Sequence, residues 1–112
     1  VPIYNKNIQF GNNTISSPSV LALRRENLIE FDESLIYLTD VDLYKRYYDR
    51  DGLPFVIDDI LVVNRLHKNQ VSQNVSKSLI RSELHYVRKK FKSDMNLKNW
   101  LVYLRRVVKT FM

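Results

Sequence analysis

The chain has 112 residues, no cysteine and a formal net charge of +6. A hydrophobic content of 45% beside 27% charged residues is typical of one folded domain with a real core, so wholesale disorder is not expected. Without cysteine the chain has neither disulfides nor a cysteine-based zinc site, which fits a reducing compartment such as the nucleus or cytosol. No apolar run reaches the roughly 18 residues of a membrane span, so no membrane association is predicted.

The charge is unevenly distributed along the chain. Residues 64–112 contain 12 Lys or Arg and 2 Asp or Glu, a net of +10, whereas residues 1–63 contain 6 and 10, a net of −4, which together give +6. A strongly basic C-terminal half predicts a partner of opposite charge, either nucleic acid or an acidic protein. The alternative is that these charges only keep a small domain soluble.

The first 33 residues are predicted to form an N-terminal arm. Glycine, proline and clustered Asn and Ser within residues 1–19 are typical of irregular chain, with one short extended piece around Ile8 to Phe10. The next segment, "SLIYLT" (34–39), is short, apolar and β-prone, and indicates a strand. A helix over 41–51 follows, with a capping side chain before it and a glycine after it.

Residues 53–66, "LPFVIDDILVVNRL", leave two alternatives open. The β-branched side chains favour two short strands, 53–58 and 60–65, around an acidic turn. Pro54 would also fit the first turn of a helix. We prefer the two strands.

Two amphipathic helices are predicted in the basic half, one over 72–92 and one from residue 97. Apolar side chains at helical spacing form a stripe on each helix. We expect these core residues to be buried: Ile80, Leu84 and Val87 on the first helix, and Trp100, Leu104 and Val107 on the second. The predicted basic surface consists of Lys77, Arg81, Arg88, Lys92, Arg105, Arg106 and Lys109.

The order of these elements resembles a BRCT domain over about residues 34–108. In that family the last helix carries a Trp that packs on a central sheet, and "LKNWLVYL" around Trp100 fits that pattern. "SLIYLT", "DGLPFVID" and "ILVVNR" resemble its first three strands. The resemblance implies an α/β fold with a parallel sheet of three or four strands, formed by one domain over 34–112 with residues 1–33 as an extension. An all-α or winged-helix domain is the competing fold.

The resemblance also implies a function, that of a non-catalytic protein-interaction module in a larger, yeast-type nuclear protein of chromatin, silencing or DNA repair. In that family a phosphopeptide pocket uses a hydroxyl at the end of the first strand and a Lys early in the second helix, positions that Thr39 and Lys77 occupy. Asp40 replaces the family's glycine, and its carboxylate would repel a phosphate. We therefore expect protein partners to be bound with weak or no phosphate dependence.

No arrangement of residues indicates an enzyme. The two histidines have no metal-ligand spacing around them, and no phosphate-binding loop or activated nucleophile is recognisable. We therefore predict no catalytic activity, no metal and no cofactor. Two further hypotheses remain, direct DNA binding by a basic helical or winged-helix domain, and homo-oligomerisation through Tyr47, Tyr48 and Tyr103.

Overall fold

The computed structural model describes residues 2–57, 59, 61–63 and 75–112. Within these ranges the fold consists of α1 (Thr39–Asp51), α2 (Lys77–Lys90) and α3 (Leu97–Lys109), with the single-turn 3-10 helices η1 (Ile8–Phe10), η2 (Pro18–Val20) and η4 (Lys92–Asp94). The described part of the chain contains no strand. The predicted α/β fold with a parallel sheet is therefore wrong, and the described residues form an all-helical domain.

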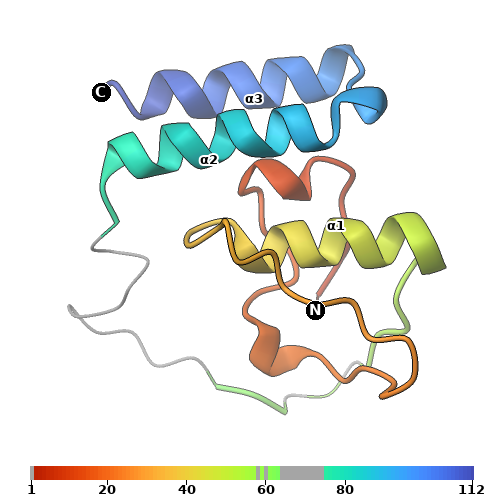
Figure 1. The fold of residues 1–112 in the computed structure, drawn as a ribbon. Coiled ribbons are helices and arrows are strands. Elements are labelled where there is room, and N and C mark those ends of the chain that lie inside the picture. The colour runs from red at the N-terminus through yellow and green to blue at the C-terminus, as the bar shows by residue number, and fades with distance from the viewer. Residues whose placement is uncertain (1, 58, 60, 64–74) are drawn as a thin grey trace.

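The three helices pack around the N-terminal segment. α2 and α3 run antiparallel as a hairpin closed by η4, and η1 lies between this hairpin and α1 (Figure 1). Ile8 and Phe10 of η1 are fully buried, and the Phe10 ring centre lies 5.7 Å from that of Tyr103 on α3. The segment that was expected to be an arm with an extended piece thus forms a helical turn and fills the centre of the core.

The segment "SLIYLT" forms the entry to α1 rather than a strand. Leu35 and Leu38, three residues apart, are both buried, whereas Ile36 between them is 62% exposed. This spacing is that of a helical turn, since a strand would bury every second residue. The backbone N–H groups of residues 36–38 donate to the carboxylate of Glu83 on α2. The donors that a sheet would need are therefore already used.

α1 is the helix predicted over 41–51, and it begins two residues earlier, at Thr39. The Asp40 carboxylate accepts the Val41 N–H at 2.9 Å, whereas the Thr39 hydroxyl donates to the carbonyl of Leu35 at 3.0 Å. Gly52 ends the helix with a φ of +82°, a conformation that favours glycine, and its N–H donates to the Tyr48 carbonyl at 2.8 Å.

The segment predicted as two strands, 53–58 and 60–65, has no regular structure at its described residues, 53–57, 59 and 61–63; residues 58, 60 and 64–66 lie outside the described ranges. Apolar side chains here are exposed, Phe55 to 93%. β-Branched residues favour strands when they can pack against a neighbouring strand. No such strand exists among the described residues.

α2 and α3 each begin at a capping side chain. The Ser76 hydroxyl accepts the Leu79 N–H at 3.2 Å and starts α2, while residues 72–74 of the predicted helix lie outside the described ranges. Asn96 and Asn99 form a reciprocal capping box that starts α3, with N···O distances of 2.9 and 3.3 Å.

Candidate interaction surface on the α2–α3 hairpin

The orientation of α3 about its own axis is fixed by buried polar contacts. Asn99 is buried, and its side-chain amide donates to the carbonyl of Lys6 at 3.2 Å and to the side-chain oxygen of Asn7. Val102 and Tyr103 pack against the core on the same side of the helix. Because a buried amide needs its hydrogen bonds, this face of α3 is held inward.

The predicted core residues divide between the core and the surface. Leu84 and Val87 of α2 are fully buried. Ile80 of α2 and Val107 of α3 are half-buried and pack against the core. Trp100 and Leu104 differ from the prediction, because they are 39% and 51% exposed. Eight of the 13 residues of α3 are apolar or aromatic, so the side chains that Asn99 leaves outward include apolar ones.

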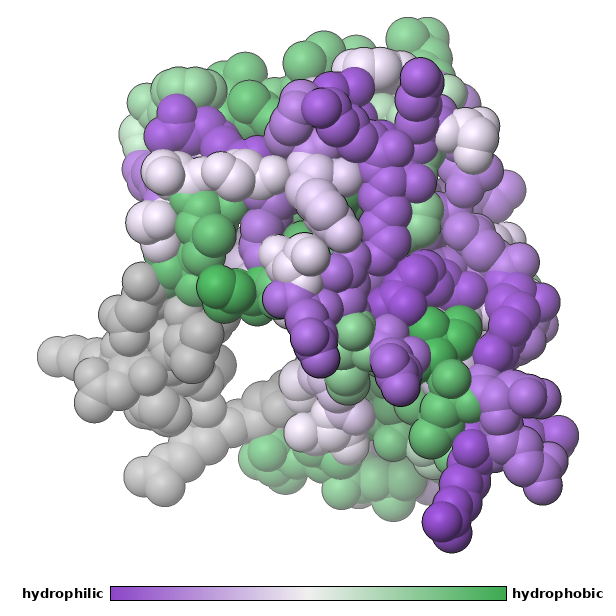
Figure 2. Space-filling view, viewed as in Figure 1, coloured by the Kyte–Doolittle hydropathy of each residue, from purple (hydrophilic) through white to green (hydrophobic). Residues whose placement is uncertain are grey.

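Exposed apolar side chains follow one line along the outer face of α3 and its C-terminal turn. We call this line the α3 ridge; its members are Leu97, Leu101, Leu104, Val108 and Phe111. Figure 2 shows hydrophobic side chains along the upper edge of the molecule, where α3 lies. All five side chains of the ridge are more than half exposed, although Arg81 of α2 stacks on the Phe111 ring.

Two arginines of α2 stack on aromatic rings, one beside the α3 ridge and one at its C-terminal end. The Cζ atom of Arg88 lies 5.4 Å from the ring centre of Trp100 and 5.6 Å from that of Tyr103. The Cζ atom of Arg81 lies 4.2 Å from the ring centre of Phe111. Such cation–π contacts hold the guanidinium groups in place between the helices. The sequence placed both arginines in the predicted basic surface, but it did not reveal their aromatic partners on α3 and its C-terminal turn.

The hairpin carries a large excess of positive charge. Residues 75–112 contain ten Lys or Arg and two Asp or Glu, a net of +8. Both acids are occupied, since Glu83 is buried against backbone N–H groups and Asp94 accepts from Lys45 of α1 at 3.2 Å. Of the ten cations, only Lys90 forms an ion pair with a described residue; the nine others are Lys77, Arg81, Arg88, Lys89, Lys92, Lys98, Arg105, Arg106 and Lys109.

The cations of α1 provide the contrast. Lys45 pairs with Asp49, Arg46 with Asp42, and Arg50 with Asp51, at 2.7 to 2.8 Å. The positive charge of α1 is thus neutralised locally, whereas that of the hairpin is available to a partner.

The predicted basic surface supplies seven of the nine unpaired cations. Four of them, Lys77, Lys92, Arg105 and Lys109, are exposed, and Arg81 and Arg88 lie along the seam between the helices. Arg106 differs, because it is half-buried and its guanidinium approaches Gly11. Gly11 has a φ of +86°, a conformation that favours glycine, and a Cβ added there would lie 2.7 Å from Nη2 of Arg106. Arg106 thus lies where α3 approaches the N-terminal segment.

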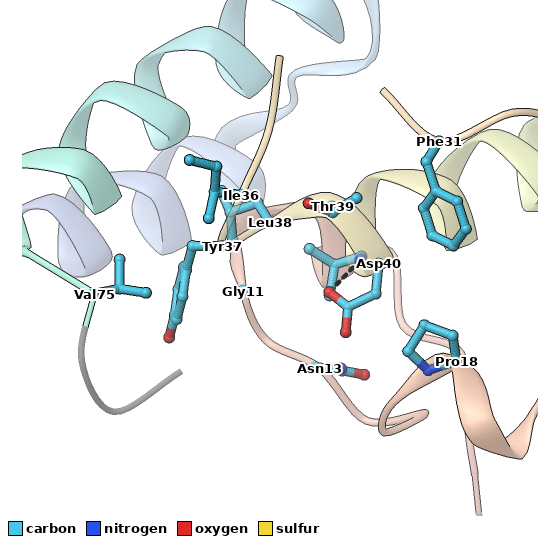
Figure 3. A pocket seen from close by; sticks show the side chains of 11 residues that line it. Gly11, Asn13, Pro18, Phe31, Ile36, Tyr37, Leu38, Thr39, Asp40 and Val75 are labelled. Carbon is cyan, nitrogen blue, oxygen red and sulfur yellow. Dashed lines mark hydrogen bonds between the residues drawn. The ribbon is translucent and has the colours of Figure 1, made fainter. Parts of the chain in front are cut away.

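The two residues of the predicted phosphate pocket have separate roles. Lys77 donates from Nζ to the backbone carbonyl of Met112. Thr39 and Asp40 line a cavity of about 440 Å³ together with Tyr37, Phe31 and Val75 (Figure 3). The described lining of this cavity contains one carboxyl group and no cation. Burial raises the pKa of the Asp40 carboxyl. A phosphate dianion would find no positive charge among these residues.

The three tyrosines of the oligomerisation hypothesis all make contacts within the chain. The Tyr47 hydroxyl accepts the Ile29 N–H at 2.9 Å. The Tyr48 ring stacks on that of Tyr4 at a centre-to-centre distance of 4.0 Å, and the Tyr103 ring packs edge-on to Trp100 at 5.8 Å. These contacts give each ring a structural role inside the domain.

Comparison of this chain with protein-family models, with curated proteins and with solved structures gave no significant match. Across the described ranges, no helix combines the length and the apolarity that crossing a bilayer requires.

Proposed function

We propose that this chain binds nucleic acid without catalysing a reaction, through contacts of the α2–α3 hairpin with the phosphate backbone. The observation that carries the proposal is the set of nine hairpin cations that make no ion pair within the described residues. Each cation that neutralises a phosphate releases a condensed counterion, and this release drives binding. A nuclear location, which was predicted from the sequence, would suit this function.

The stacked arginines support the same proposal. Arg81 and Arg88 lie over aromatic rings, so their side chains lose little freedom when they bind a ligand. A guanidinium that stacks by its face keeps N–H donors at its edge for the oxygens of a phosphate. Arg88 and Arg81 each lie over a face of Trp100 and Phe111, which reduces the ring surface that the hairpin offers to the bases of a single strand. A duplex is therefore the expected form of the nucleic acid.

The dimensions of the hairpin fit several phosphate contacts. α2 has 14 residues and α3 has 13. At 1.5 Å per residue each helix is about 20 Å long. Successive phosphates of one strand are about 3.4 Å apart along the duplex axis, so about six of them lie within that length. We expect sequence-independent binding, because backbone contacts carry no base information.

The test uses a fluorescent DNA duplex of mixed sequence and two double variants of equal charge. Arg105→Gln with Lys109→Gln removes two exposed hairpin cations, and Arg24→Gln with Arg25→Gln removes two exposed cations from the N-terminal segment. At about 0.1 M salt we expect the hairpin variant to bind about tenfold or more weakly than the unmodified chain. The control variant should stay within about twofold. Equal losses in both variants would show a nonspecific effect of net charge and would contradict the proposal.

A further inference from the structure

We infer that the α3 ridge is a docking site for an amphipathic helix of a partner protein, one with acidic side chains beside its apolar stripe. The ridge residues, Leu97, Leu101, Leu104, Val108 and Phe111, are separated by four, three, four and three positions. This is the alternation of the two seam positions in a coiled coil. A helix with this pattern presents a straight apolar line to a second helix.

The exposure of the ridge is unusual for a surface helix. Leu97 is 77% exposed, and all five ridge side chains are more than half exposed. Single exposed apolar residues are normal, but a continuous apolar line on a monomer marks an interaction site. The line covers two heptads, about 20 Å of helix.

The charges beside the ridge select the kind of partner. Lys98 and Arg105 each follow a ridge residue directly, in the position that faces the flanking charges of a bound helix. Neither forms an ion pair with a described residue. On the opposite side Arg88 covers Trp100. A bound helix therefore meets positive charge on both flanks, and Glu or Asp beside its stripe would be neutralised there.

The same charges disfavour the docking of a second copy of this chain on the ridge. Two hairpins, each with a net charge of +8, would face each other across the seam. In an antiparallel pair Lys98 would lie close to Arg105 of the other copy, a like-charge contact. An acidic partner helix buries the same apolar side chains without this repulsion.

α3 is also preorganised for binding a partner helix. Its N-terminus is fixed by the Asn96–Asn99 capping box, and its inner face is held by Asn99 against Asn7. Because the helix and its orientation are formed beforehand, binding does not have to order this side of the interface. The inference goes beyond the proposed function, since nucleic acid would contact the cations and leave the ridge uncovered.

The probes are two synthetic helical peptides of three heptads with Leu at both seam positions. They differ only at the flanking positions, which carry Glu in one peptide and Lys in the other. We expect the Glu peptide to bind the chain at least tenfold more tightly than the Lys peptide at about 0.1 M salt, and this preference to shrink as salt rises. Emission of Trp100, the single tryptophan, provides a second readout because the ring lies at the edge of the ridge.

Two variants with equal numbers of apolar replacements locate the binding surface. Leu101→Gln with Leu104→Gln removes the middle of the ridge, and we expect it to weaken binding of the Glu peptide at least tenfold. Leu53→Gln with Phe55→Gln removes two exposed apolar side chains outside the hairpin and should leave the affinity unchanged. The ridge variant should keep its affinity for a DNA duplex, so failure of this inference is separable from failure of the proposed function.

Three results would overturn the inference. Equal affinity for both peptides would show that the flanking charges do not select the partner helix. A concentration-dependent dimer that the ridge variant abolishes would identify a second copy as the occupant. Binding to vesicles of anionic lipid, lost in the ridge variant and combined with no binding of the Glu peptide, would identify a membrane surface as the ligand.

Discussion

Glu83 of α2 accepts the backbone N–H of Tyr37 at 2.8 Å, across 46 positions of the chain. The same buried carboxylate accepts from Ile36 and Leu38, the two residues on either side. These charge-assisted hydrogen bonds join the middle of α2 to the start of α1. They explain why α1 begins at this point although its N-cap residue, Leu38, has no side chain that can cap the helix.

Glu83→Gln should therefore lower the stability of the whole domain. The amide keeps one acceptor oxygen but turns an NH2 group toward backbone donors, which leaves buried polar groups without partners. We expect the free energy of unfolding to fall by about 2–4 kcal/mol. Urea denaturation measures this as a lower midpoint with an unchanged slope. Glu33→Gln, at an exposed acid, is the control and should leave the midpoint unchanged.

Two chemically identical changes test which side of the hairpin is core. Leu84 is fully buried and Leu104 is half exposed on the ridge. Leu84→Ala should cost about 2–5 kcal/mol, because it removes apolar contacts and leaves a cavity. Leu104→Ala should cost less than about 1 kcal/mol, as surface changes do. If urea denaturation gave equal losses for the two variants, the outward orientation of the ridge would be wrong.

The buried position of η1 predicts that the N-terminal segment is essential to the fold. Phe10→Ala should cost about 3–5 kcal/mol, since the ring is fully buried between the helices. Phe55→Ala, the same change at a ring that is 93% exposed, is the matched control and should have little effect. A Phe10 variant that melts at the same temperature as the unmodified chain would show that residues 2–11 are dispensable.

Asp32 should make the domain sensitive to acid. A hydrogen bond from Lys90, with further ones from the Tyr86 hydroxyl and the Ser34 backbone, holds the pKa of the Asp32 carboxyl below its ordinary value of 3.8. Because the folded state favours the ionised form, its stabilising contribution is complete above that value and is lost as the pH falls below it. Asp32→Asn should thus be less stable than the unmodified chain at pH 6.

The gap between Asp32→Asn and the unmodified chain should narrow as the pH falls from about 5 to 2.5. Unfolding midpoints measured across this range provide the test, and a gap that stays constant with pH would contradict the role of the ionised carboxylate. The Asp40 carboxyl should change the stability in the opposite direction. Burial raises its pKa, so its contribution to the free energy of unfolding is complete at low pH and is lost as the pH rises through the raised pKa.

The sequence was sufficient to place the helices, because apolar spacing and local capping act over a few residues. It was not sufficient to orient α3. The choice of its inner face depends on Asn99 meeting Asn7, which is 92 positions away. The segment "SLIYLT" has the composition of a strand, and its structure as a turn depends on Glu83, which supplies acceptors that no local pattern reveals.

The candidate surface was predicted only in part for the same reason. Local charge counting found the basic residues of the hairpin, but their availability depends on distant partners. Lys90 is neutralised by Asp32, which is 58 positions away, whereas its neighbour Lys89 makes no ion pair within the described residues. Leu104 of the α3 ridge, like Trp100 beside it, was interpreted as core because an apolar stripe looks the same in sequence whether the domain or a partner covers it.

The salt dependence of duplex binding tests the central claim most directly. The affinity of the unmodified chain should fall linearly in a plot of log affinity against log salt concentration, because phosphate contacts release counterions. Removing Arg105 and Lys109 together should reduce that slope by about two, one for each lost phosphate contact, and removing Arg24 and Arg25 should leave it unchanged. A slope that is the same for all three proteins, or no duplex binding at about 50 mM salt, would contradict the assignment of the hairpin as a nucleic-acid interface.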